Sequence, residues 1–107
     1  MKPDYIKPEE VTSPRRSWRL IRVLQNGEHP DKYGNRVAIA IGTWDGHPAL
    51  GQRWNGSKNS PIGNPQSRGL PTWFIIPRRQ EDAVIDLIET LSDDDKKMFK
   101  ALLGKPS

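Results

Sequence analysis

The sequence predicts an α+β domain, in which an antiparallel four-stranded meander is followed by a helix and a short C-terminal helix. Four stretches rich in β-branched and aromatic residues, separated by glycine, asparagine and proline, occupy residues 17–76. Apolar residues at helical spacing follow Pro77. A run of strands and then of helices is typical of the α+β class. With 107 residues, the chain has the length of one domain.

The first two strands are expected at residues 17–25 and 36–44, with turn-forming residues 26–35 between them. Partial alternation in the first strand puts Trp18, Leu20, Arg22 and Leu24 on one face. In the second strand a β-branched face lies opposite a face of unusually small residues, which are Ala38, Ala40 and Gly42. We expect the small face either to let a helix or a second sheet approach closely or to line a concave groove.

The third strand is expected at residues 48–54, because the strong hairpin signal Asp45-Gly46 precedes it and Asn55-Gly56 follows it. Residues 55–71 are rich in glycine, proline, asparagine and serine. They predict a long loop, and loops of this length in small domains are usually functional or disordered. A fourth strand at residues 72–76 ends at Pro77.

Two helices are expected after the strands. Residues 78–91 carry an apolar stripe at helical spacing, made by Val84, Ile85, Leu87, Ile88 and Leu91. Ser92, with Asp95 three residues later, resembles a capping box and predicts the start of the second helix, which Gly104 ends. Residues 1–14 contain three prolines and five charges without periodicity, so we expect a flexible N-terminal arm and a single domain over residues 15–107.

Composition excludes several classes of function. The chain has no cysteine, and His29 and His47 lie in turn segments with no evident partner. No glycine-rich segment is followed by the Gly-Lys-Ser/Thr of a phosphate-binding loop. We therefore expect no catalytic residues, no metal site and no cofactor, and a protein that is not an enzyme. A small-ligand site beside the small-residue face ranks last. No apolar run could span a bilayer and no secretory signal is evident, so a cytoplasmic protein without membrane contact is expected.

The distribution of charge indicates a polyanionic partner. The net charge is +4, but residues 15–79 hold eleven cations and three acids, a local charge of +8. Nine of the eleven are arginine, whose planar fork suits phosphate. Four tryptophans fall in or at the ends of expected strands, and we expect at least two of them in the core. Cations with flat rings are typical of single-strand binding. The candidate nucleic-acid-binding residues are Arg19, Arg53, Trp54, Lys58, Arg68 and Trp73.

Two families share features with this chain. The run from Gly51 to Gly56, Gly-Gln-Arg-Trp-Asn-Gly, and the run from Pro61 to Phe74, with Gly-Asn-Pro-Gln-Ser-Arg-Gly-Leu-Pro-Thr-Trp-Phe at its end, resemble a block in short uncharacterised bacterial proteins of integron and similar mobile gene cassettes. The likeness covers about residues 17–90. It implies a bacterial, cytoplasmic accessory protein and carries no assigned activity.

The layout is also similar to that of positive cofactor four, a family of single-stranded-DNA-binding transcriptional coactivators. In that family a curved four-stranded meander precedes a helix through which the protein dimerises. Gln52-Arg53-Trp54 resembles its aromatic strand end, and residues 65–69 resemble its loop with proline, glycine and basic residues. The resemblance implies DNA contacts at Arg53, Trp54, Lys58 and Arg68. The family's paired loop lysines and its helix tryptophan have no counterpart here.

Two functions therefore remain open. The first is an accessory module that binds nucleic acid, single-stranded DNA in particular. The second is a protein-interaction or regulatory module encoded by a mobile element, with a homodimer as the expected state. Apolar residues make up 34% of the chain, a low share that predicts a thin core which a second copy could help to complete.

Overall fold

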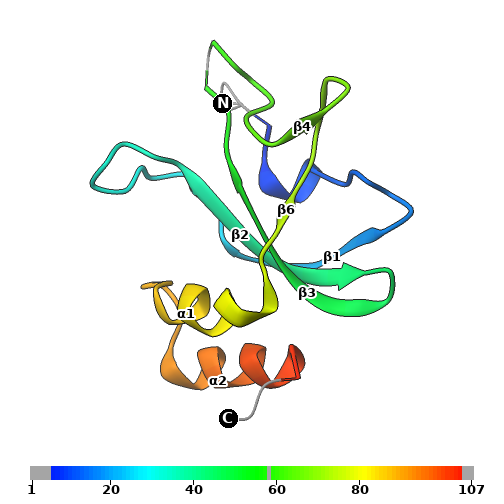
Figure 1. The fold of residues 1–107 in the computed structure, drawn as a ribbon. Coiled ribbons are helices and arrows are strands. Elements are labelled where there is room, and N and C mark those ends of the chain that lie inside the picture. The colour runs from blue at the N-terminus through cyan, green and yellow to red at the C-terminus, as the bar shows by residue number, and fades with distance from the viewer. Residues whose placement is uncertain (1–5, 58, 105–107) are drawn as a thin grey trace.

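The computed structural model, which describes residues 6–57 and 59–104, confirms the α+β class (Figure 1). Its main sheet is antiparallel and has the strand order β1-β2-β3-β6. The strands are β1 (Trp18–Gln25), β2 (Val37–Trp44), β3 (His47–Trp54) and β6 (Phe74–Ile75). The first three follow one another as the meander predicts. The fourth strand, expected at residues 72–76, is shorter than predicted. Thr72 and Trp73 lie before β6, and Ile76 and Pro77 lie after it.

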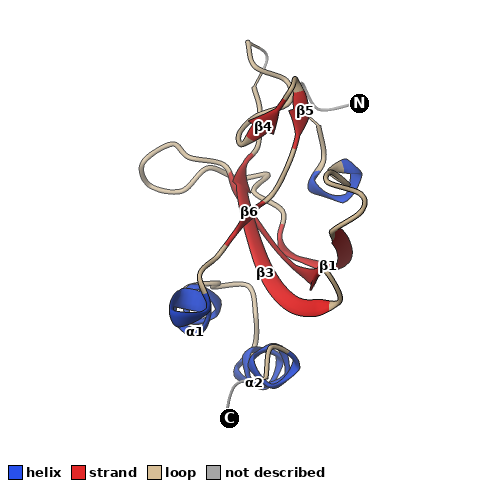
Figure 2. Cartoon of the chain, turned by 45° about the vertical axis from the view of Figure 1, so that its right-hand side comes forward, coloured by secondary structure: helices blue, strands red, loops and turns tan. Residues whose placement is uncertain are grey.

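The long segment between β3 and β6 carries structure of its own. Strands β4 (Gln66–Ser67) and β5 (Leu70–Pro71) pair as a small separate hairpin. Figures 1 and 2 both place this hairpin at the end of the molecule opposite the helices. The segment expected to be a loop therefore includes an ordered projection beside the main sheet.

The helical part is divided more finely than its apolar stripe predicts. A 3₁₀ turn, η2 (Arg78–Gln80), leads into α1 (Glu81–Asp86), and α2 (Asp93–Leu102) follows. After α1 the amide N–H of Ile88 donates to the carbonyl of Ile85, and that of Leu91 donates to Ile88. These three-residue steps replace α-helical bonds after Asp86, so the expected helix over residues 78–91 ends early, with Ile88 buried and Leu87 exposed. The predicted cap is present, because Ser92 Oγ accepts from the Asp95 amide at 3.1 Å.

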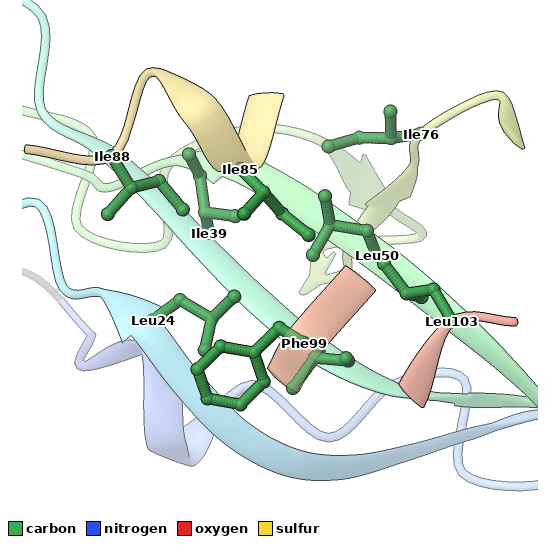
Figure 3. Packing of buried hydrophobic residues seen from close by; sticks show 9 residues of the cluster. Leu24, Ile39, Leu50, Ile76, Ile85, Ile88, Phe99 and Leu103 are labelled. Carbon is green, nitrogen blue, oxygen red and sulfur yellow. The ribbon is translucent and has the colours of Figure 1, made fainter. Parts of the chain in front are cut away.

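One face of the sheet packs against the helices. Ile39 and Ile41 of β2 and Leu50 of β3 meet side chains of both helical segments (Figure 3). The whole cluster consists of Leu24, Ile39, Ile41, Leu50, Ile76, Ile85, Ile88, Phe99 and Leu103. Arg22, on β1, lies over the ring of Phe99 with 5.5 Å from its guanidinium carbon to the ring centre. The β-branched face of the second strand is thus the face that the helices cover.

The small-residue face is covered by two indoles. Trp18 and Trp73 lie 5.9 Å apart between ring centres and pack with Ala38, Ala40 and Ala49. The indoles and the segment around Val11, rather than α1, α2 or the β4–β5 hairpin, are the described parts of the chain that cover this face. Irregularities in the β1–β2 register break the strict alternation of β1, so Trp18 belongs to this cluster and Leu24 to the helix-side one. The expectation of a single shared face for these two residues is wrong.

Residues 6–14, expected as part of a flexible arm, pack against the small-residue face. The Ile6 amide donates to the carbonyl of Pro61 at 2.8 Å, and Val11 is fully buried. The indole N–H of Trp73 donates to the Val11 carbonyl at 2.8 Å. A one-turn 3₁₀ helix, η1 (Pro8–Glu10), shapes this segment. Residues 1–5 of the expected arm lie outside the described residues. Among those described, no helix is long and apolar enough to cross a membrane.

Candidate nucleic-acid interface

Two exposed aromatic side chains lie on neighbouring strands of the main sheet. Phe74 of β6 is opposite Gln52 of β3, and Trp54 is two residues further along β3. Successive residues of a strand point to opposite faces, so Gln52, Trp54 and Phe74 share one face. The Trp54 side chain is 47% exposed and that of Phe74 is 50% exposed. Diagonal neighbours of this kind are within reach of one another for aromatic side chains. We refer to Trp54 and Phe74 as the aromatic pair.

The aromatic pair lies on the helix-side face but beyond the part that the helices cover. Leu50, four residues before Trp54 on the same face, is fully buried under the helices. Val37 is directly opposite Trp54 and packs at the border of that core. The covered face therefore continues into an uncovered stretch, and this stretch carries two large aromatic rings.

The β4–β5 hairpin brings a cation to the same end of the sheet. Trp54 and Asn64 exchange two backbone hydrogen bonds, of 2.8 and 3.0 Å, and β4 begins two residues after Asn64. Arg68 and Gly69 form the hairpin's turn, with φ values of 51° and 78°. Positive φ at both central residues is the geometry of a type I′ turn. Arg68 is exposed at this tip, and Leu70 beside it is 57% exposed.

Arg53 does not belong to the exposed surface. It follows Gln52 and precedes Trp54, so it points to the opposite face, where it is fully buried. Its guanidinium donates to the carbonyl of Thr72 at 2.6 Å and to the carbonyl of Ile62. Burial lowers the pKa of Arg53 to about 10, which leaves it charged at neutral pH. Arg53 ties β3 to the loop before β6, and its assignment as a nucleic-acid contact is corrected to a structural one.

Trp73 is also an interior residue. Its side chain is 4% exposed, stacked beside Trp18 and bonded to the Val11 carbonyl. A base has no access to its ring, so its assignment to the binding surface is corrected as well. The expectation that at least two tryptophans lie in the core is met by Trp18 and Trp73.

Arg19 is exposed but is far from the aromatic pair. It is opposite Thr43 on β2, which is opposite Pro48 on β3. Trp54 is six residues beyond Pro48, a separation of roughly 20 Å along the strand. Lys58 lies outside the described residues. Of the six residues expected from the sequence, the structure thus brings Trp54 and Arg68 to the same end of the sheet.

Phe74 was not among the expected residues, although the sequence holds a signal for it. Adjacent residues of a strand face opposite sides, so Trp73 and Phe74 cannot both be interior to the same face. Once Trp73 is known to point toward the small-residue face, Phe74 has to point toward the side of Trp54. Sequence alone leaves open which of the two adjacent rings is exposed.

Within residues 6–57 and 59–104, no group of three or more histidine, cysteine or acidic side chains is placed to hold a metal ion. What the site combines is flat apolar rings and an exposed guanidinium. Comparison with protein families, curated proteins and solved structures found no match for the chain.

Proposed function

We propose that this protein binds single-stranded nucleic acid by stacking bases on the aromatic pair. The observation that carries the proposal is the exposure of Trp54 and Phe74 on adjacent strands, on the part of the helix-side face that the helices leave uncovered. Each base stacked on an aromatic ring contributes about 1–3 kcal/mol. Two rings at neighbouring positions suit two successive unpaired bases, whereas a duplex keeps its base faces covered. The role is binding without catalysis.

The charge of the described surface supports the same proposal. Nine of the eleven cations between residues 15 and 79 are exposed; Arg53 is buried and Lys58 is outside the described residues. Among these cations is Arg68, which the β4–β5 hairpin brings to the end of the sheet that carries the aromatic pair. Exposed cations attract phosphates without regard to sequence and make the affinity fall as salt is added. Rings and charge together give the combination that single-strand binding uses.

The test is fluorescence anisotropy of a labelled single-stranded oligonucleotide, titrated with the full chain at low and near-physiological salt. Trp54→Ala and Phe74→Ala should each weaken binding by between about fivefold and a hundredfold, the equivalent of one lost stack. Tyr33→Ala is the matched control, because Tyr33 is 75% exposed in the loop between β1 and β2. Circular dichroism verifies that each variant is folded. Absence of binding at low salt, or equal losses in all three variants, contradicts the proposal.

A self-associating regulatory module is the second candidate. The observation that favours it is the exposure of Met98 and Leu102, four residues apart on α2, at 50% and 44%. Sedimentation equilibrium of the wild type and of Met98→Glu tests this second candidate function. A dimer that the variant dissociates favours this candidate, and a monomer at all concentrations argues against it. In either case we propose a cytoplasmic accessory protein of a bacterial mobile gene cassette, as the resemblance of residues 51–74 implies.

A further inference from the structure

A concave feature lies at the end of the sheet away from the aromatic pair, beside the edge strand β1. β1 is an edge strand, and the N-terminal segment passes beside its start. Between them is an open hollow of about 540 Å³, lined by Thr12, Arg15, Trp18, Arg19 and Leu20. Pockets for small molecules typically have volumes of this order. We refer to it as the Trp18 hollow.

The charged and hydroxyl side chains that line the Trp18 hollow can donate hydrogen bonds. Arg15 and Arg19 each bring a guanidinium, which has no acceptor atom, and the Thr12 hydroxyl can donate as well. None of the described residues that line the hollow is acidic. Both arginines are exposed, and neither is paired with an acid among the described residues. The lining therefore has a charge of +2, and no ion pair with an acid of the described residues offsets it.

Trp18, which also lines the hollow, has a buried indole N–H. The Trp18 side chain is 2% exposed, and its Nε1 has no hydrogen-bond partner among the described residues. Its neighbour Trp73 shows the usual situation, because the Trp73 N–H donates to a carbonyl at 2.8 Å. A buried donor without an acceptor destabilises the fold, and such groups are rare in native proteins. The Trp18 ring thus forms part of the wall of the hollow, and its N–H is a buried donor without a partner among the described residues.

We propose that the Trp18 hollow binds a phosphate monoester. Such a group has a charge of −1.5 to −2 near neutral pH and three acceptor oxygens, which match two guanidinium groups and further donors. A carboxylate has one charge and two oxygens and leaves part of the lining unsatisfied. Leu20 provides an apolar wall for the remainder of the ligand. The monoester is that of a free small molecule or the terminal phosphate of a nucleic-acid strand.

The test uses the indole N–H resonances in a ¹H–¹⁵N correlation spectrum of the full, ¹⁵N-labelled chain. Adenosine 5′-monophosphate is added at constant ionic strength, with adenosine and acetate as controls. The Trp18 resonance, assigned with Trp18→Phe, should shift with saturation, and the Trp73 resonance should stay in place because its N–H is already bonded. No shift of the Trp18 resonance, or an equal shift with adenosine or acetate, overturns the proposal.

Charge variants give a second reading that does not depend on the Trp18 assignment. Arg15→Gln and Arg19→Gln should each weaken the binding of adenosine 5′-monophosphate at least tenfold. Arg16→Gln is the matched control, because Arg16 is adjacent, exposed and absent from the lining. Its affinity should equal that of the wild type. Equal weakening by all three variants would mean that general surface charge, and not the hollow, attracts the anion, and would overturn the proposal.

The proposal for the Trp18 hollow and the proposal for the aromatic pair can be refuted independently of each other. Adenosine 5′-monophosphate should shift the Trp18 resonance in Trp54→Ala as it does in the wild type, whether or not oligonucleotides bind. Oligonucleotides with a 5′-phosphate or a 5′-hydroxyl then identify the source of the phosphate. A shift that requires the 5′-phosphate supports the strand terminus, and a shift with the mononucleotide alone supports a free small molecule. If Trp54→Ala no longer showed the shift with adenosine 5′-monophosphate, the proposal that the hollow is a binding site of its own would be overturned.

Discussion

Replacing Arg53 with methionine tests whether this side chain serves the fold or a nucleic acid. Methionine keeps most of the apolar stem and removes the guanidinium. The hydrogen bonds to the carbonyls of Thr72 and Ile62 are then lost. These two carbonyls belong to the segment between β3 and β6, so the loss acts on the attachment of the loop to the sheet. We expect Arg53→Met to be a folding variant.

The size of the effect follows from two opposing contributions. A hydrogen bond with one charged partner contributes about 1.5–3 kcal/mol, so two of them contribute about 3–6 kcal/mol. The cation's burial offsets part of this, as the lowering of the pKa of Arg53 to about 10 indicates. We therefore expect the free energy of unfolding to fall by about 2–3 kcal/mol. This is a large part of the roughly 5–15 kcal/mol of a typical domain.

Urea denaturation followed by tryptophan fluorescence measures the loss, and the midpoint should fall by about 1–2 M. Arg53→Lys keeps the charge but offers a single donor group in place of the fork, so an intermediate loss is expected. Below the unfolding transition, the salt dependence of oligonucleotide binding should be that of the wild type. Unchanged stability together with a weaker salt dependence would refute the reasoning, because that pair of results describes an exposed phosphate contact.

Two further variants test the sheet and the hairpin. Gly42→Ala should lower the free energy of unfolding by about 1–3 kcal/mol, because its Cβ would collide with the Arg19 carbonyl oxygen and lie 2.7 Å from Trp18 Cη2. Gly51→Ala, whose nearest contacts are at 3.3 Å, should lower it less, and the reverse order in thermal unfolding would contradict the packing described. Arg68→Asn should raise stability by about 0.4–1 kcal/mol, since asparagine suits the positive φ of Arg68. The same variant should reduce the slope of log affinity against log salt by about 0.7, and an unchanged slope would remove Arg68 from the interface.

Local patterns predicted the elements well where neighbouring residues determine them. The strand over residues 37–44 and the cap at Ser92 depend on residues within one short window, and both are present. The helix over residues 78–91 was predicted too long because the apolar stripe is compatible with two backbone paths. The structure follows the path with three-residue hydrogen-bond steps after Asp86. An α-helix and a series of such turns both place apolar residues three positions apart on one side, so the stripe does not distinguish them.

The site was harder to predict because its residues depend on contacts between distant segments. The cover of the small-residue face comes from Trp18 and Trp73, which are 55 positions apart in the sequence, and from Val11. The sequence around Val11 has no periodicity and therefore does not predict that this segment packs against the small-residue face. Arg53 is a charged residue at an inward position, and its acceptors are backbone carbonyls of a loop. Carbonyl groups belong to every residue, and a sequence does not show which ones converge.

The exposed position of the aromatic pair follows from the lengths of the elements. β3 has eight residues and extends about 26 Å, whereas α1 has six residues and extends about 9 Å, and α2 has ten and extends about 15 Å. Helices of this length leave part of a sheet face uncovered, as Figure 2 shows for the end near the hairpin. On a sheet face that only contacts water, polar side chains are the usual occupants of such positions. Trp54 and Phe74 are instead large apolar side chains that are about half exposed there. Large exposed apolar groups that lie close together are typical of binding surfaces.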